Sequence, residues 1–142
     1  MQRTCSEAHV LVAKQAAESV GVAVRIGRIV SVPKVLWRGE EKRHVSAETG
    51  AIGGDMESVA LGDAAALREV PFLVVRAVSD LVDEDLPLNF NLFLNPVDWP
   101  CGIVQAVTTP SCLPGLVRLG RQSRVAAERL QAVMAKFLEA MP

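Results

Sequence analysis

The apolar run over residues 70–78, Val-Pro-Phe-Leu-Val-Val-Arg-Ala-Val, constrains the fold of this chain more than any other feature. Pro71 precedes a predicted strand over 72–78 that is apolar on both faces except at Arg76. Strands of this kind are typical of the interior of a parallel sheet, which helices cover on both sides. The run is much shorter than the roughly 20 apolar residues that span a bilayer. We therefore expect an α/β fold and no membrane span.

A helix and a second strand precede this run. Residues 51–55 form a short predicted strand, and the helix predicted over 56–68 carries Val59, Ala64 and Leu67 on one face. Strand, helix and strand in this order predict a βαβ unit with two parallel strands. Alternating apolar residues predict a further strand over about 22–32, which ends or reaches a sheet edge at Pro33.

Helical periodicity marks the rest of the chain. Thr4 and Glu7 have the spacing of a capping box and predict a helix that ends at Gly21. Short helices are predicted over 40–45 and 102–107, the second inside a loop over 86–115 that holds five of the eight prolines. The C-terminal helix has one apolar stripe, formed by Leu116, Leu119, Ser123, Ala126, Leu130, Val133 and Phe137.

Composition limits the class of protein. A chain of 142 residues with 50% apolar residues predicts one globular domain, and a net charge of −1 argues against nucleic acid as a partner. Three cysteines, two histidines and no CxxC spacing indicate reduced thiols, a cytoplasmic protein and no metal site. The polar start indicates no secretory signal. A mean hydropathy of +0.27 favours apolar surface buried in a homo-oligomer or against a missing part of the fold.

Two acids follow predicted strands. Glu57 lies just after the strand over 51–55, and Asp80 comes after the strand over 72–78. Ligands of open parallel sheets bind beyond the carboxyl ends of the strands, so both acids are candidates for one crevice. Glu57 is alternatively a helix N-terminal acid and Asp80 a turn residue. We expect Asp55 to bond backbone amides at the same junction and Arg76 to pair with a carboxylate.

Two segments carry a family resemblance. Residues 50–60, Gly-Ala-Ile-Gly-Gly-Asp-Met-Glu-Ser-Val-Ala, and residues 70–80, which end in Val-Arg-Ala-Val-Ser-Asp, resemble the core signature of the purine nucleoside phosphorylase and nucleosidase superfamily. Residues 27–31 and the pair Glu41-Lys42 match this signature loosely, and residues 113–119 are similar to the hopanoid-associated branch of the superfamily. The resemblance implies a three-layer α/β/α domain over residues 1–142 that lacks its N-terminal part. That part carries the phosphate-binding turn of the phosphorylases and the water-activating Glu of the nucleosidases.

The resemblance also implies roles for particular residues. Asp80 becomes the catalytic acid near N7 of the leaving purine, and Ser79 orients the Asp80 carboxyl group. Glu57 accepts the two ribose hydroxyls and stabilises the cationic sugar, while Met56 lies against the sugar face. Trp37 is a substitute for the family's aromatic residue over the base. No cofactor and no metal is implied.

We expect a purine nucleoside or a purine base as the ligand, and N-glycosidic cleavage by water or phosphate as the family activity. A non-catalytic nucleoside-binding module is the first alternative, because the acids are present and the nucleophile site is not. A structural fragment of the fold is the second. The residues leave open which nucleoside and which attacking group apply, and whether this short chain is active.

Overall fold

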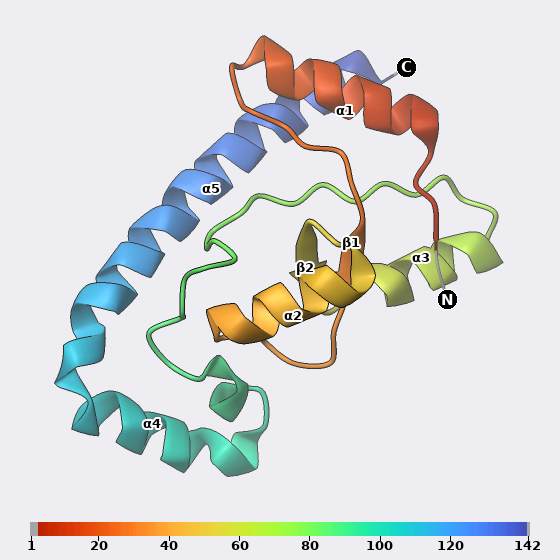
Figure 1. Ribbon diagram of the computed structural model, residues 1–142. Coiled ribbons are helices and arrows are strands. Elements are labelled where there is room, and N and C mark those ends of the chain that lie inside the picture. The colour runs from red at the N-terminus through yellow and green to blue at the C-terminus, as the bar shows by residue number, and fades with distance from the viewer. Residues whose placement is uncertain (1–2, 142) are drawn as a thin grey trace.

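The computed structural model describes residues 3–141 (Figure 1). In chain order the regular elements are α1 Glu7–Ser19, β1 Ile29–Ser31, α2 Gly39–Thr49, β2 Gly53–Asp55, α3 Ser58–Leu67, α4 Trp99–Thr108 and α5 Leu113–Ala140. Three 3-10 turns flank α4, namely η1 Phe90–Phe93, η2 Pro96–Asp98 and η3 Pro110–Cys112. The mixture of helices with a small parallel sheet confirms the α/β class.

The sheet consists of β1 and β2, which are parallel and pair with Ile29 opposite Gly53. Backbone bonds extend the pairing by one residue at each end, from Ile52 N to Arg28 O at 2.9 Å and from Val32 N to Asp55 O at 2.8 Å. Helix α2 connects the two strands. The βαβ unit therefore uses the strands on either side of α2, one step earlier in the chain than the sequence predicts.

The predicted strand over 72–78 is wrong. This segment is extended but has no strand partner, and its one backbone bond to another part of the described chain runs from Ser6 N to Phe72 O at 2.9 Å. A strand exists only where a neighbour satisfies its N–H and C=O groups, and apolar composition does not supply that neighbour. The same cause reduces the predicted strand over 22–32 to the three residues of β1.

The main core lies between α1 and the C-terminal half of α5, which run side by side in Figure 1. Ala16, Ala17, Val133 and Phe137 are buried there, and Leu73 of the extended segment packs against them. This confirms the apolar stripe of the C-terminal helix. The predicted capping box is wrong: α1 begins at Glu7 after Ser6, without a side-chain cap bond.

The other predicted helices are present, although Leu67 on the predicted apolar face of α3 is exposed. Helix α2 is longer than predicted and ends at Gly50, whose φ of 66° is the left-handed conformation that favours glycine. Helix α3 lies close to the extended segment at Gly62, where a Cβ atom would stand 3.1 Å from the Phe72 ring. A larger residue at Gly62 would push Phe72 away from α3.

Much apolar surface is exposed. Leu67 is 85% exposed, Val97 80% and Val107 74%, and these side chains belong to different elements. Within residues 3–141, no helix combines the length and the apolar character that crossing a membrane requires.

Candidate functional site

The carboxyl end of β2 is built around Asp55, whose side chain is 4% exposed. Ser31 Oγ at the end of β1 donates to Asp55 Oδ1 over 2.7 Å, and the Ser58 backbone N–H donates to the same oxygen over 3.1 Å. The Ser58 hydroxyl and Arg76 Nη2 both contact Asp55 Oδ2, the latter at 2.6 Å. The bond from the Ser58 N–H confirms the prediction that Asp55 accepts from the backbone at this junction.

These contacts determine the charge on Asp55. Burial raises the pKa of the Asp55 carboxyl, but hydrogen bonds from Ser58, Ser31 and Arg76 outweigh it and lower the pKa from 3.8 to about 2. Asp55 is therefore a structural carboxylate that joins β1, β2, α3 and the extended segment.

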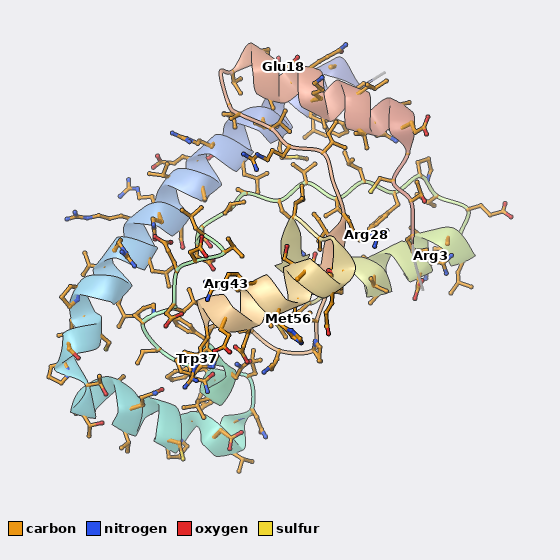
Figure 2. All side chains as sticks on the ribbon, viewed as in Figure 1. Arg3, Glu18, Arg28, Trp37, Arg43 and Met56 are labelled. Atoms are coloured by element: carbon orange, nitrogen blue, oxygen red, sulfur yellow. The ribbon has the colours of Figure 1, made fainter. Side chains whose placement is uncertain are left out.

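Glu57 and Met56 occupy the turn between β2 and α3. Glu57 is the N-cap residue of α3, and Arg76 Nη2 lies 3.2 Å from Glu57 Oε2. The Glu57 side chain is 62% exposed, and Met56, which is labelled in Figure 2, is 36% exposed. Burial lowers the pKa of Arg76, but bonds to Asp55 and Glu57 raise it by more. The prediction that Arg76 pairs with a carboxylate is confirmed, and it pairs with two.

Ser79 and Asp80 end the extended segment. Ser79 Oγ donates to Asp80 Oδ1 over 2.9 Å, and Lys42 Nζ of α2 donates to Asp80 Oδ2 over 2.6 Å. Asp80 is 28% exposed at its side chain, so it remains reachable from solvent. The serine is thus in position to orient the carboxyl group, while the roles of both residues in substrate binding stay predictions.

The structure brings the four predicted residues to one end of the βαβ unit through two separate networks. Arg76 anchors Glu57, and Lys42 anchors Asp80. Within residues 3–141, no hydrogen bond or ion pair joins Glu57 to Asp80 directly. Both carboxylates retain acceptor positions, because each oxygen accepts up to two hydrogen bonds.

Lys42 belongs to a loose match to the family signature, but the sequence analysis predicted neither its partner nor its role. A single lysine on a charged helix has the pattern of a solvated residue, and no local signal indicates a partner 38 positions away. The available signal was the group of acidic residues between Asp80 and Asp85. Three of them contact α2 or its start: Asp80 binds Lys42, Asp83 binds Arg43, and Asp85 accepts from Gly39 N at 2.7 Å.

Trp37 lies in the loop between β1 and α2 (Figure 2). The guanidinium carbon of Arg38 lies 4.5 Å from the centre of the Trp37 ring. The Trp37 carbonyl accepts a hydrogen bond from Leu86 N over 2.7 Å. The stacking of Trp37 over a purine base remains a prediction. The described residues contain no group of three or more His, Cys, Asp or Glu side chains that could hold a metal.

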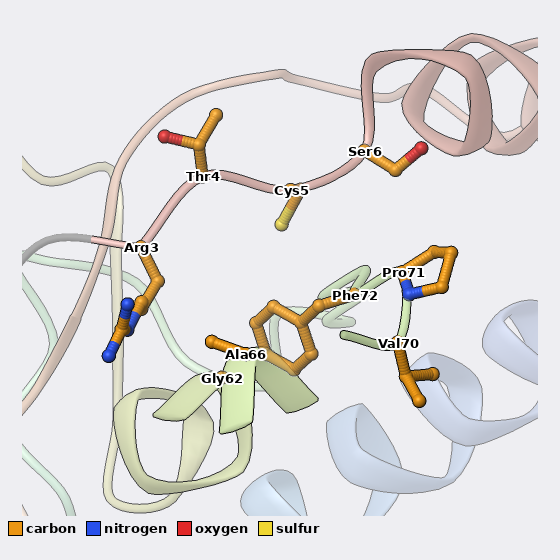
Figure 3. A pocket seen from close by; sticks show the side chains of 9 residues that line it. All are labelled: Arg3, Thr4, Cys5, Ser6, Gly62, Ala66, Val70, Pro71 and Phe72. Carbon is orange, nitrogen blue, oxygen red and sulfur yellow. The ribbon is translucent and has the colours of Figure 1, made fainter. Parts of the chain in front are cut away.

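A cavity of about 450 Å³ lies elsewhere (Figure 3). Arg3, Cys5 and Phe72 line it, together with six others: Thr4, Ser6, Gly62, Ala66, Val70 and Pro71. Phe72 and Asp80 stand at opposite ends of the extended segment, up to roughly 26 Å apart. A second cavity reaches Asp80 and Glu84 but holds only about 10 Å³. Of the four predicted residues, Met56 and Glu57 are exposed and Ser79 and Asp80 are half-buried.

Comparison with known proteins identifies the class. The family model described as Phosphorylase superfamily matches residues 1–96, which include both signature segments and every residue discussed around Asp55 and Asp80. The chain belongs to the phosphorylase superfamily.

Part of the chain is also similar to curated nucleosidases. The chain is 31% identical over 81 residues to the 5'-methylthioadenosine/S-adenosylhomocysteine nucleosidase of Staphylococcus aureus strain Newman, and equally to that of strain COL. Each match covers 56% of this chain and 36% of the relative, so the chain spans about a third of the length of these relatives. No solved structure matches the chain significantly.

Proposed function

We propose that this chain binds a purine nucleoside or its base at the surface between β2, α2 and the end of the extended segment, in a superfamily whose reaction is N-glycosidic cleavage. The observation that carries the proposal is the pair of anchored carboxylates. Glu57 is held by Arg76 and Asp80 by Lys42 and Ser79, and all five residues belong to the part that the family model matches.

The chemistry of the bond explains the two carboxylates. Cleavage leaves positive charge on the ribose and negative charge on the purine. In this proposal Glu57 accepts the 2′- and 3′-hydroxyls, and Met56 supplies an apolar contact for the sugar. Asp80, oriented by Ser79, hydrogen-bonds the purine near N7 and supports its departure.

Binding without turnover is the second candidate function. It is favoured by the exposure of the two acids, whose side chains are 62% exposed at Glu57 and 28% exposed at Asp80. Water exclusion strengthens every electrostatic contact in a catalytic site, so this exposure favours binding over rate acceleration. We retain the three-layer arrangement, the single domain and a homo-oligomer as proposals, the last because of the exposed apolar side chains.

Calorimetry with adenine, adenosine and 2′-deoxyadenosine tests the proposal. Asp80→Asn should lower the affinity for adenine roughly 10- to 150-fold, which is the contribution of one charge-assisted hydrogen bond. Glu57→Gln should leave the affinity for adenine unchanged. It should lower the affinity for adenosine more than the affinity for 2′-deoxyadenosine. Asp83→Asn is the matched control, because Asp83 is in the same loop and its side chain is 75% exposed.

Two results decide between the outcomes. Absence of adenine and adenosine binding by the unmodified chain at millimolar concentration would overturn the proposed function. Release of free adenine from 5'-methylthioadenosine or adenosine, followed by chromatography and lost in Asp80→Asn, would favour catalysis over binding alone.

A further inference from the structure

Lys42 is the most enclosed basic side chain among the ion pairs of the described residues, with 11% of its side chain exposed. Its ammonium group has three acceptors, all in one short stretch of chain. These are Asp80 Oδ2 at 2.6 Å, the Glu84 carbonyl at 2.7 Å and the Leu81 carbonyl at 3.2 Å. An ammonium group has three N–H donors, so each donor has a partner.

The geometry differs from that of an ordinary surface ion pair. The neighbouring pair of Arg43 and Asp83 spans the same helix and loop at 2.9 Å, but its side chains are 55% and 75% exposed. Exposed pairs contribute little, because water screens the charges and both side chains keep alternative positions. Enclosure of Lys42 makes its partners obligatory, since an enclosed charge without acceptors is costly.

Further bonds attach the same loop to the start of α2. Gly39 N donates to Asp85 Oδ1 and Leu86 N donates to the Trp37 carbonyl, each over 2.7 Å. Inside the loop, Leu81 N donates to Glu84 Oε2 over 3.1 Å. The loop over 80–86 therefore follows α2, and Lys42 is the side chain that connects α2 to the carboxylate itself.

We propose that Lys42 is a positioning residue for base recognition: it fixes Asp80 Oδ2 and the loop over 81–84 before a ligand arrives. The inference rests on the proposed function. Ser79 holds the other oxygen, so the carboxylate is restrained from both sides while each oxygen keeps an acceptor position for a donor on the base. A group restrained before binding loses less conformational entropy when the ligand binds.

Four variants separate positioning from general stability. Lys42→Met removes the charge and all three donors, Lys42→Gln keeps two donors, and Lys42→Arg keeps the charge. Arg43→Met is the matched control, because it breaks the adjacent ion pair to the same loop without touching Asp80. Circular dichroism shows which variants fold, and Lys42→Gln serves if Lys42→Met does not.

Amide hydrogen exchange of residues 80–86, measured by mass spectrometry, requires no ligand. Lys42→Met should raise exchange in this segment roughly 10-fold or more, because the loop loses its three bonds to the helix. Lys42→Arg should restore part of the protection, and Arg43→Met should resemble the unmodified chain. Equal exchange in Lys42→Met and Arg43→Met would overturn the inference.

A double-mutant cycle with adenine binding tests the link to Asp80. Lys42→Met should lower the affinity for adenine roughly 10-fold in the unmodified background. In the Asp80→Asn background it should leave this affinity unchanged. Additive losses would show that Lys42 acts independently of Asp80 and would overturn the inference. If the unmodified chain binds no adenine, the proposed function fails together with the link to base recognition, while exchange still decides whether Lys42 fixes the loop.

Discussion

Replacing Asp55 by asparagine tests the network that joins β1, β2 and the extended segment. Hydrogen bonds from Ser58, Ser31 and Arg76 outweigh burial and lower the Asp55 pKa from 3.8 to about 2, and the side chain is 4% exposed. A depression of this size corresponds to about 2 kcal/mol of free energy of unfolding. Because the folded-state pKa is the lower one, this stabilisation is complete above the unfolded pKa and disappears as pH falls from about 4 towards 2.

Urea unfolding followed by circular dichroism, from about pH 6 to about pH 2, measures the effect. Other carboxyl groups titrate in the same range, so the informative quantity is the stability difference between the unmodified chain and Asp55→Asn. We expect this difference to be at least about 2 kcal/mol near neutral pH and to shrink by about 2 kcal/mol towards pH 2. Asp83→Asn is the control, since its exposed pair predicts little change. A difference for Asp55→Asn that stays constant across the range would refute the reasoning.

Three further substitutions test other contacts by the same unfolding assay. Ser31→Ala removes bonds to Asp55 Oδ1 and to Val59 N, at 2.7 and 3.0 Å, and should cost about 1–2 kcal/mol; no loss would contradict a structural role for the hydroxyl. Glu69 has a φ of 54° after α3, so Glu69→Gly should stabilise by about 0.5–1 kcal/mol, whereas a loss would show that its side chain matters. Phe137→Ala empties the core between α1 and α5 and should cost about 3–5 kcal/mol, against little change for the exposed Leu138→Ala.

Helices were predictable from the sequence because their hydrogen bonds are local. The apolar stripe through Val133 and Phe137 predicted α5, and Gly21 marked the end of α1, since backbone angles and near neighbours decide both features. The pairing of Arg76 with a carboxylate was predictable, because a cation within an apolar run needs an acid nearby. The identity of its partners, Asp55 and Glu57, was not predicted.

Features that depend on distant partners were not predictable. The run over 72–78 has the composition of a central strand, yet its backbone has no strand beside it, and composition contains no information about that neighbour. The partner of Lys42 was not predicted, because the enclosure of this side chain depends on how the loop after Asp80 folds against α2. At the candidate site, the pairing of Arg76 with a carboxylate was therefore predicted, and the pairing of Lys42 with Asp80 was not.

The core between α1 and α5 joins the two ends of the described chain, and this has a kinetic consequence. Ala17 and Val133 are more than 100 residues apart, so the contact closes a long loop at an entropic cost on the order of 4 kcal/mol. During translation the apolar face of α1 emerges before α5 and lacks its partner until α5 is made. We expect refolding to be slow compared with helical proteins of local topology, and nascent chains to depend on chaperones until Phe137 has emerged.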